Sequence, residues 1–388
     1  MKALEKIRVI EFCQVAAGPF AGMLLADLGA DVIKVEPPGQ GDSLRSWPPL
    51  SNGFSENFAA LNRNKRSIVL DLKSEQGTRA ARRLIETADV VIENNRPGVM
   101  ARLGLDYVTV KPLNQHLVYC SISAFGQSGP RAADGGFDTA VQAASGIMSV
   151  TGEEGGAPMK AGVPVADLST ALYAAYTITA LLRRVAAGGA GGYIDMSMLG
   201  ASLGISAFQT SEYFGTGQDP KKHGSAHPRN APYQAFKTRD THFVMAGAND
   251  KLWASVCKVI ERTDLVDDKR FLTTADRAAN QTQLKECLEE VFAQDDAANW
   301  IERLRAEGVP CEPINTYSAV LDDPQVAHSG WLSDLTLASG VQTQAFGFPG
   351  IIDAENAPIY RTAPSLGEHT EELLNEIGLG DAVFKDDA

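Results

Sequence analysis

The first two hundred residues alternate short β-rich runs with stretches of helical periodicity. This alternation is typical of βαβ units, in which parallel strands form one sheet and helices cover both faces. We therefore predict a Rossmann-like α/β domain over residues 1–205. Its expected strands are RVIEFC, DVIKVE, SIVLDL, DVVIEN, LVYCSIS and YIDMSML.

The pattern changes after residue 205. Periodicity weakens and polar and glycine residues gather over 206–229, which indicates a linker. Two strand-like runs and several amphipathic helical stretches follow, so we expect a smaller α+β domain over 230–330. The last segment, 331–388, ends in a capped amphipathic helix and is expected to complete the large domain.

Net charge excludes some classes of partner. The chain has a formal charge of −13 and a pI near 5.0, whereas proteins that bind nucleic acids or membrane surfaces need dense positive charge. The N-terminal residues lack the pattern of a secretory signal, and five widely spaced cysteines give no disulfide framework. We expect a cytoplasmic protein with reduced cysteines.

Familiar cofactor and catalytic motifs are missing from the sequence. No G-x-G-x-x-G follows the first strand, and there is no Walker phosphate loop, H-E-x-x-H or G-x-S-x-G. The six histidines are scattered. We therefore expect neither a metal site nor a tightly bound cofactor.

Basic residues cluster near the ends of successive predicted strands. Each cluster alone is compatible with a solvated loop, since Lys and Arg are mostly exposed. Ligands of open α/β sheets bind at the carboxyl ends of strands, so together these cations could converge on one phosphate-bearing ligand. The residues concerned are Arg63, Lys65, Arg66, Arg96 and Arg102.

One carboxylate, Asp167, stands in the apolar run GVPVADLSTALYA (162–174) at the threshold of a predicted buried helix. An aspartate at this place can accept hydrogen bonds from free N–H groups of the following helix as an N-cap. It can also serve as a nucleophile. The local pattern leaves both roles open.

Several further motifs, in fixed order along the whole chain, resemble the class III coenzyme A transferases of the CaiB/BaiF type. They are VIEFCQVAAGPFAGMLLADLGADVIKVE, NRNKRSIVLDLK, IENNRPGVMARLGL, SISAFGQSGP, GFDTAVQAASGIMSVTG, GVPVADLSTALYA, HPRNAPYQAF, DDPQVAHSG and LGEHTEELLNEIG. The resemblance implies that Asp167 is the catalytic carboxylate. It also implies that the chain transfers coenzyme A between carboxylic acids through mixed anhydrides and an aspartyl-CoA thioester.

The resemblance further implies which residues contact substrates, with coenzyme A as a co-substrate and no metal. Three residues depart from formyl-CoA transferase, which has glutamine at Ala16, a basic residue at Pro37 and lysine at Ser123. The acyl or acceptor acid is expected near Arg45, Trp47, His227 and Gln234. Coenzyme A is expected near Val15, Ala16, Asn62, Arg63, Asn64, Lys65, Asn94, Asn95, Arg96, Arg102, Ser123, Ala124, Phe125 and Gly126.

The segment HGSAHPRNAPYQAFKT is most similar to the branch that uses succinyl-CoA and glutarate, so a short dicarboxylate is the expected acceptor. The partners implied are acyl-CoA, small carboxylic acids and a second copy of the chain in an interlocked homodimer. Two alternatives remain. α-Methylacyl-CoA racemases share this fold but have a proton-carrying histidine where this chain has Phe137, and some family members are non-catalytic subunits of heteromeric transferases.

Overall fold

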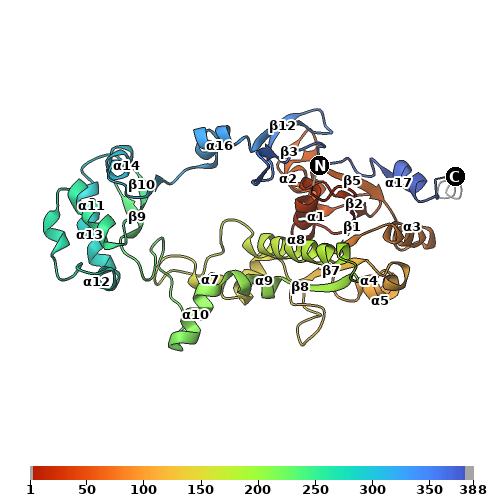
Figure 1. The fold of residues 1–388 in the computed structure, drawn as a ribbon, viewed down its shortest axis with the longest axis horizontal. Helices are drawn as coiled ribbons and strands as arrows, with labels where there is room; N and C mark the ends of the chain where they lie inside the picture. The colour runs from red at the N-terminus through yellow and green to blue at the C-terminus, as the bar shows by residue number, and fades with distance from the viewer. Residues whose placement is uncertain (1–2, 381–388) are drawn as a thin grey trace. The chain divides into compact units, whose positions relative to one another are not determined.

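The structure is a computed structural model that describes residues 3–380. It divides into two compact units, each of which is described by itself (Figure 1). Of the described residues, the first comprises 3–147, 160–217 and 325–380, and the second comprises 148–159 and 218–324. Residues 206–229, expected as a linker, contain the helix α10 (Ala207–Thr216), which belongs to the first unit.

A six-stranded parallel sheet forms the centre of the first unit and confirms the predicted α/β fold class. The order of its strands places β1 beside β6, so the direction of winding reverses between these two strands. Ligands bind at such a switch point in doubly wound sheets. In spatial order the strands are β5 (Lys65–Val69), β2 (Asp31–Glu36), β1 (Arg8–Phe12), β6 (Val90–Glu93), β7 (Val118–Ser123) and β8 (Gly192–Ser197).

Helices cover both faces of this sheet (Figure 1). One face packs against α1 (Ala17–Asp27) and α8 (Val165–Ala186), and the other against α3 (Glu75–Glu86) and α17 (Thr370–Glu376). Buried strand residues therefore point alternately into two apolar cores. By length and composition α8 could cross a membrane, but its buried residues belong to the first of these cores.

Shorter elements complete the first unit and its return from residue 325. They are η1 (Ser43–Ser46), β3 (Leu50–Ser51), β4 (Phe54–Ser55), α2 (Glu56–Asn62), α4 (Val99–Arg102), α5 (Tyr107–Val110), η2 (Lys111–Leu113), α6 (Asp138–Ala144), α9 (Met198–Ile205), α16 (Pro324–Ser329), β12 (Leu332–Thr336), β13 (Gln342–Phe346), β14 (Ile351–Ile352) and β15 (Glu355–Asn356). The short helix α7 (Ile147–Val150) starts in the first unit and continues into the second.

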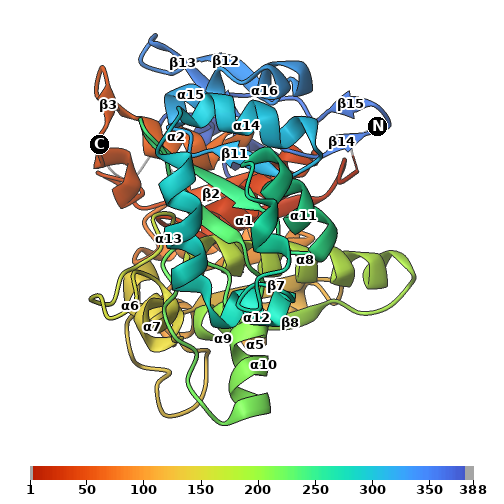
Figure 2. The same ribbon diagram turned by 90° about the vertical axis from the view of Figure 1, so that its left-hand side faces the viewer.

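The second unit is a small antiparallel sheet packed against helices, of which Figure 2 labels α11, α12, α13 and α14. Its strands, in the order β11 (Cys311–Pro313), β10 (His242–Ala246) and β9 (Tyr233–Lys237), include the hairpin expected from the sequence. Large aromatic side chains fill its core. The remaining elements are α11 (Asp250–Val259), η3 (Thr263–Val266), α12 (Thr274–Ala279), α13 (Gln281–Phe292), α14 (Ala297–Ala306) and α15 (Tyr317–Leu321).

Four buried charged side chains form a network around Glu11, which is the next-to-last residue of β1. Glu11 pairs with Lys34 at 3.0 Å and with Lys65 at 2.8 Å, and Lys34 also pairs with Asp42 at 2.9 Å. All four are almost fully buried. A buried charge is tolerated only when it is paired, so these groups constrain one another's positions. We call Glu11, Lys34, Asp42 and Lys65 the buried ion cluster.

Removing one charge from the buried ion cluster should be costly. In Glu11→Gln, two ammonium groups lose a shared partner, so the free energy of unfolding should fall by about 3 kcal/mol or more. Glu307→Gln is the matched control, because Glu307 is part-exposed and pairs with the exposed Lys258 at the surface, where a loss below about 1 kcal/mol is expected. Urea unfolding followed by circular dichroism measures both. Equal losses would contradict the role of the cluster.

Candidate active site

A cavity of about 450 Å³ opens at the carboxyl ends of β1, β6 and β7, at the switch point of the sheet. Asp167 and Phe137 line it together with residues from the loops that follow these strands. The remaining lining residues are Gln14, Val15, Ala16, Ala17, Ser43, Asn94, Asn95, Arg96, Ile122, Ser123, Ala124, Gly136 and Met198. Its place agrees with the rule for ligand sites in doubly wound sheets.

The loop that follows β1 is held tightly. Asn94 clamps Gln14 by two hydrogen bonds, in which its side chain accepts from the Gln14 N–H at 2.9 Å and donates to the Gln14 carbonyl at 2.8 Å. Val15 adopts φ of +65°, a conformation that is strained for a β-branched residue. The Val15 N–H donates to Asp42 of the buried ion cluster at 3.1 Å. The cluster therefore stabilises a strained turn at the cavity wall.

The first turn of α1 also borders the cavity, through Ala16 and Ala17. The N-cap residue of this helix is Ala16, which has no side-chain oxygen to accept from the first N–H groups. These N–H groups lack partners within the helix itself. The helix start is therefore suited to stabilise negative charge that develops in the cavity.

Asp167 lies in the first turn of α8 rather than before it. The helix begins at Val165, with Pro164 as the N-cap residue and no capping hydrogen bond from that side chain. The prediction that Asp167 could be the N-cap is therefore wrong. The side chain of Asp138, on α6, accepts from the Ala166 N–H at 2.9 Å and from the Asp167 N–H at 3.4 Å instead.

The surroundings of Asp167 disfavour its charged form. Burial raises the pKa of its carboxyl to about 7, and the nearby charge of Asp138 adds to the shift. Perturbed pKa values of this kind gather at functional sites. An ionised Asp167 is therefore poorly solvated, and a carboxylate in that state is a stronger nucleophile than one in water.

Half of the residues expected to hold coenzyme A line this cavity: Val15, Ala16, Asn94, Asn95, Arg96, Ser123 and Ala124. Phe125 and Gly126 follow directly, and Phe125 lies under the guanidinium of Arg131. The Gly126 N–H donates to the Ser123 hydroxyl. Arg102 is exposed at the end of α4. Arg96, also exposed, is the cation among the residues that line the cavity.

The residues Asn62 to Lys65 do not line the cavity. Arg63 and Asn64 bind the carboxylate of Asp27, while Lys65 belongs to the buried ion cluster and also donates to Asn62. The expected convergence of Arg63, Lys65 and Arg66 with Arg96 is not found, because these three residues precede or open β5 instead of following it. Their charges are balanced by carboxylates inside the protein.

Arg66 illustrates this internal use of charge. Its guanidinium forms ion pairs with Asp31 and with two residues of α17, Glu372 in the first turn and Glu376 at the end. A basic residue expected to face a ligand therefore holds the C-terminal helix on the sheet. The pairing partner lies about three hundred residues away in the chain, so the local sequence could not reveal it.

The four residues expected to contact the acid lie in two different units. Arg45 forms two hydrogen bonds with the carboxylate of Glu36, at 2.7 and 2.6 Å, and Trp47 is half exposed on the first unit. Neither lines the cavity of Asp167. His227 and Gln234 belong to the second unit, where His227 stacks on Tyr233. Among the described residues, the buried amide nitrogen of Gln234 has no hydrogen-bond partner.

Sequence reasoning missed Asp138 and Gln142, which link α6 to the start of α8. The Gln142 amide donates to Asp138 at 2.7 Å and accepts from the Ala161 N–H at 2.9 Å. A signal was present, since Asp138 lies in the motif GFDTAVQAASG that carries the resemblance. The motif does not reveal that its carboxylate serves a helix that begins 27 residues later.

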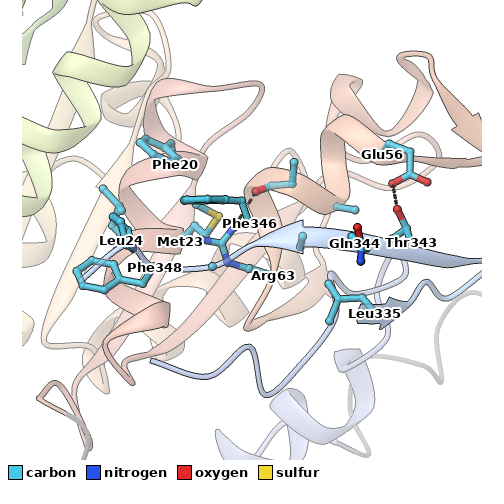
Figure 3. A pocket seen from close by; sticks show the side chains of 15 residues that line it. Phe20, Met23, Leu24, Glu56, Arg63, Leu335, Thr343, Gln344, Phe346 and Phe348 are labelled. Carbon is cyan, nitrogen blue, oxygen red and sulfur yellow. Dashed lines mark hydrogen bonds between the residues drawn. The ribbon is translucent and has the colours of Figure 1, made fainter. Parts of the chain in front are cut away.

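A second cavity, of about 380 Å³, lies between α1, α2 and the β12–β13 hairpin (Figure 3). Figure 3 shows mainly apolar side chains around it, including Phe20, Phe346 and Phe348. Its charged groups are engaged within the protein, because Arg63 binds Asp27 and Glu56 accepts from the Thr343 hydroxyl. Of these two cavities, the one lined by Asp167 contains the poorly solvated carboxylate.

The chain is similar to several known proteins. The model of CoA-transferase family III matches residues 4–370. The chain is 39% identical to the succinate–glutarate CoA-transferase of Agrobacterium fabrum, over 96% of this chain and 95% of that protein. It is 37% identical to the acetyl-CoA:oxalate CoA-transferase of Acetobacter aceti, over 97% and 96% of the two chains.

A solved structure is equally similar. The crystal structure of a CaiB/BaiF family protein from Brucella suis superposes with a TM-score of 0.86 at 38% identity and covers 97% of this chain and 99% of that one. Within residues 3–380 no group of three or more His, Cys, Asp or Glu side chains is arranged to hold a metal ion.

The raised pKa of Asp167 has a measurable effect on stability. Between the ordinary pKa of about 4 in the unfolded chain and about 7 in the folded protein, the folded state binds more protons, so stability falls as the pH rises. Asp167→Asn removes this penalty. Its free energy of unfolding at pH 8 should exceed that of the unaltered protein by about 1 to 4 kcal/mol, and the difference should shrink toward pH 5.

Urea unfolding at pH 5, 6.5 and 8 measures this difference. Asp134→Asn is the matched control, since Asp134 is exposed and pairs with Arg131, and it should show no gain at pH 8. A gain in Asp167→Asn that does not depend on pH would contradict the assignment.

Proposed function

Because the chain belongs to CoA-transferase family III, and is therefore a CoA-transferase, we propose that Asp167 is its nucleophile and that a short dicarboxylic acid is its acceptor. The observation that carries the proposal is the position of Asp167: a poorly solvated carboxylate in a cavity at the switch point of the sheet. Such a group can form and release covalent acyl derivatives.

The proposed reaction proceeds by four acyl transfers. The Asp167 carboxylate attacks the thioester carbonyl of the donor, the C–S bond breaks, and coenzyme A leaves as the thiolate. The thiolate attacks the aspartyl carbonyl of this mixed anhydride and releases the donor acid. The acceptor carboxylate attacks the resulting aspartyl-CoA thioester, whose C–S bond breaks and expels the thiolate again. The thiolate then attacks the acceptor carbonyl of this second anhydride, the bond from that carbonyl to the bridging oxygen breaks, and the acceptor leaves as its coenzyme A thioester while Asp167 returns to the free carboxylate.

Each transfer passes through an oxyanion. N–H groups in the first turn of α1 border the cavity and can donate to it, and each well-placed donor contributes about 3 kcal/mol to the transition state. Arg96 is an exposed cation that lines the cavity, and Arg102 is exposed at the end of α4, so we assign both to the phosphates of coenzyme A. Asn62 to Lys65 would act on coenzyme A indirectly, by supporting the sheet and its loops.

The proposed acceptor follows from the relatives. The Agrobacterium protein is named for succinate and glutarate, which are both dicarboxylic acids, and the Acetobacter protein for oxalate, the shortest one. A second carboxylate needs a charge-assisted partner away from the reacting carbonyl.

The racemase alternative considered from the sequence is disfavoured by the cavity. Racemization requires a group that removes and returns a proton, and the position of the family's histidine is occupied by Phe137, which lines the cavity. A phenyl ring cannot carry a proton. This residue therefore favours the transferase.

Assembly as an interlocked homodimer is part of the proposal. Large apolar side chains on α8 and α10 are exposed in the single chain, among them Leu172, Tyr176, Phe208 and Phe214. Exposed apolar surface of this kind usually marks an interface. Interlocked chains cannot separate without local unfolding, so sedimentation should detect dimers at nanomolar concentration. A monomer at that dilution would contradict this assembly.

Replacing the nucleophile should abolish transfer without loss of the fold. We expect Asp167→Ala to retain less than about one thousandth of the turnover, because the atom that forms the covalent bond is gone. The measurement is succinyl-CoA consumption with glutarate as the acceptor. Asp134→Ala, which removes an exposed carboxylate, is the control and should keep full activity. Turnover above a few per cent in Asp167→Ala would disprove the nucleophile.

A panel of acids tests the acceptor class. With succinyl-CoA as the donor, glutarate should react about 10 to 100 times more efficiently than butyrate, because an additional charge-assisted contact is worth about 1.5 to 3 kcal/mol. Oxalate and carnitine complete the panel. A preference for oxalate would move the proposal to the acid of the Acetobacter relative, and a preference for butyrate or carnitine would end the dicarboxylate proposal.

A further inference from the structure

Asp138 occupies an unusual place beside the nucleophile. Its carboxylate accepts three hydrogen bonds, from the Ala166 N–H at 2.9 Å, the Asp167 N–H at 3.4 Å and the Gln142 amide at 2.7 Å. Gln142 is fully buried and accepts in turn from the Ala161 N–H. One carboxylate of α6 therefore fixes both the start of α8 and the segment that leads into it.

The first N–H groups of α8 have no hydrogen-bond acceptor from the N-cap residue of the helix. The N-cap residue is Pro164, whose side chain has no acceptor for the free N–H groups of the first turn. Asp138 supplies that acceptor from another helix, and one of its bonds goes to the N–H of Asp167 itself. A shift of Asp138 therefore moves the backbone of the nucleophile directly.

The same carboxylate also lies close enough to influence the charge of Asp167. Burial is the larger cause of the raised pKa of Asp167, and the charge of Asp138 raises this pKa further.

Other charged groups on the elements around α8 are engaged elsewhere. The charge of Asp27 is balanced by Arg63, and Asp195 accepts from the Gln127 N–H. Arg96 lines the same cavity from the loop after β6. Titratable groups on the elements packed against α8 are Asp27 on α1, Asp138 on α6, Tyr119 and Cys120 on β7, and Tyr193 and Asp195 on β8.

We propose that Asp138 is a positioning residue that holds the first turn of α8 and whose negative charge favours the acylated form of Asp167 over the free carboxylate. The inference rests on the proposed function, in which Asp167 becomes acylated. Repulsion between two carboxylates raises the free energy of the unreacted enzyme. It disappears when Asp167 becomes a neutral anhydride or thioester, because the negative charge leaves with the thiolate or with the released acid.

Neutralising Asp138 separates its two roles. In Asp138→Asn the side-chain oxygen can still accept from the helix N–H groups, but the charge is gone. The pH at which kcat/KM reaches half its maximum on the acid side should move from near 7 to a value about one unit lower. The fraction of Asp167 found as aspartyl-CoA thioester during turnover, measured by mass spectrometry of the peptide, should fall about tenfold.

Two further variants control for structural effects. Gln142→Leu loosens the same hydrogen-bond network while leaving both carboxylates in place, so its pH midpoint should match that of the unaltered protein. Asp138→Ser retains a neutral capping oxygen and replaces Asp138→Asn if that variant does not fold. Its midpoint should move in the same direction as that of Asp138→Asn.

The outcomes distinguish the inference from the function on which it rests. If Asp167 forms the adduct but the midpoint is unchanged in Asp138→Asn and Asp138→Ser, the inference is overturned and the proposed function stands. An equal shift in Gln142→Leu would also overturn it, since charge would then not be the cause. If the unaltered protein forms no adduct at Asp167, the proposed function itself fails.

Discussion

The cavity depends on the buried ion cluster of Glu11, Lys34, Asp42 and Lys65 beneath it. Two of these groups reach the loop after β1, because Lys34 donates to the Cys13 carbonyl and Asp42 accepts from the Val15 N–H. Without them, the left-handed conformation of Val15 would relax, since a β-branched residue strongly disfavours it. The first turn of α1 would then lose its place at the cavity.

A second carboxylate performs a similar task for Asp167, the proposed nucleophile. Asp138 completes the start of α8 where Pro164 cannot, and it places a negative charge near Asp167. Hydrogen bonding and repulsion therefore act from the same atoms, one stabilising the helix and the other destabilising the free carboxylate. Such local conflicts are typical of functional sites and are balanced by the stability of the surrounding fold.

The sequence predicted the fold class and the motif around Asp167 because both depend on local patterns. Alternating strand and helix periodicities are visible in the chain, and the GVPVADLSTALYA segment is short and continuous. The uses of Arg63, Lys65 and Arg66 were not predictable in this way. Each is settled by a carboxylate remote in the sequence, namely Asp27, Glu11 and Glu376. The local sequence of a basic cluster does not show whether its side chains bind a phosphate or a buried carboxylate.

The most direct test of the account follows oxygen atoms. During transfer, one oxygen of the acceptor carboxylate becomes the bridging oxygen of the second anhydride and remains on Asp167 when the thiolate returns. A single turnover with the acceptor acid labelled by ¹⁸O should therefore leave one heavy oxygen in the peptide that contains Asp167, detected by mass spectrometry. An unlabelled Asp167 after complete turnover would contradict covalent catalysis by this carboxylate.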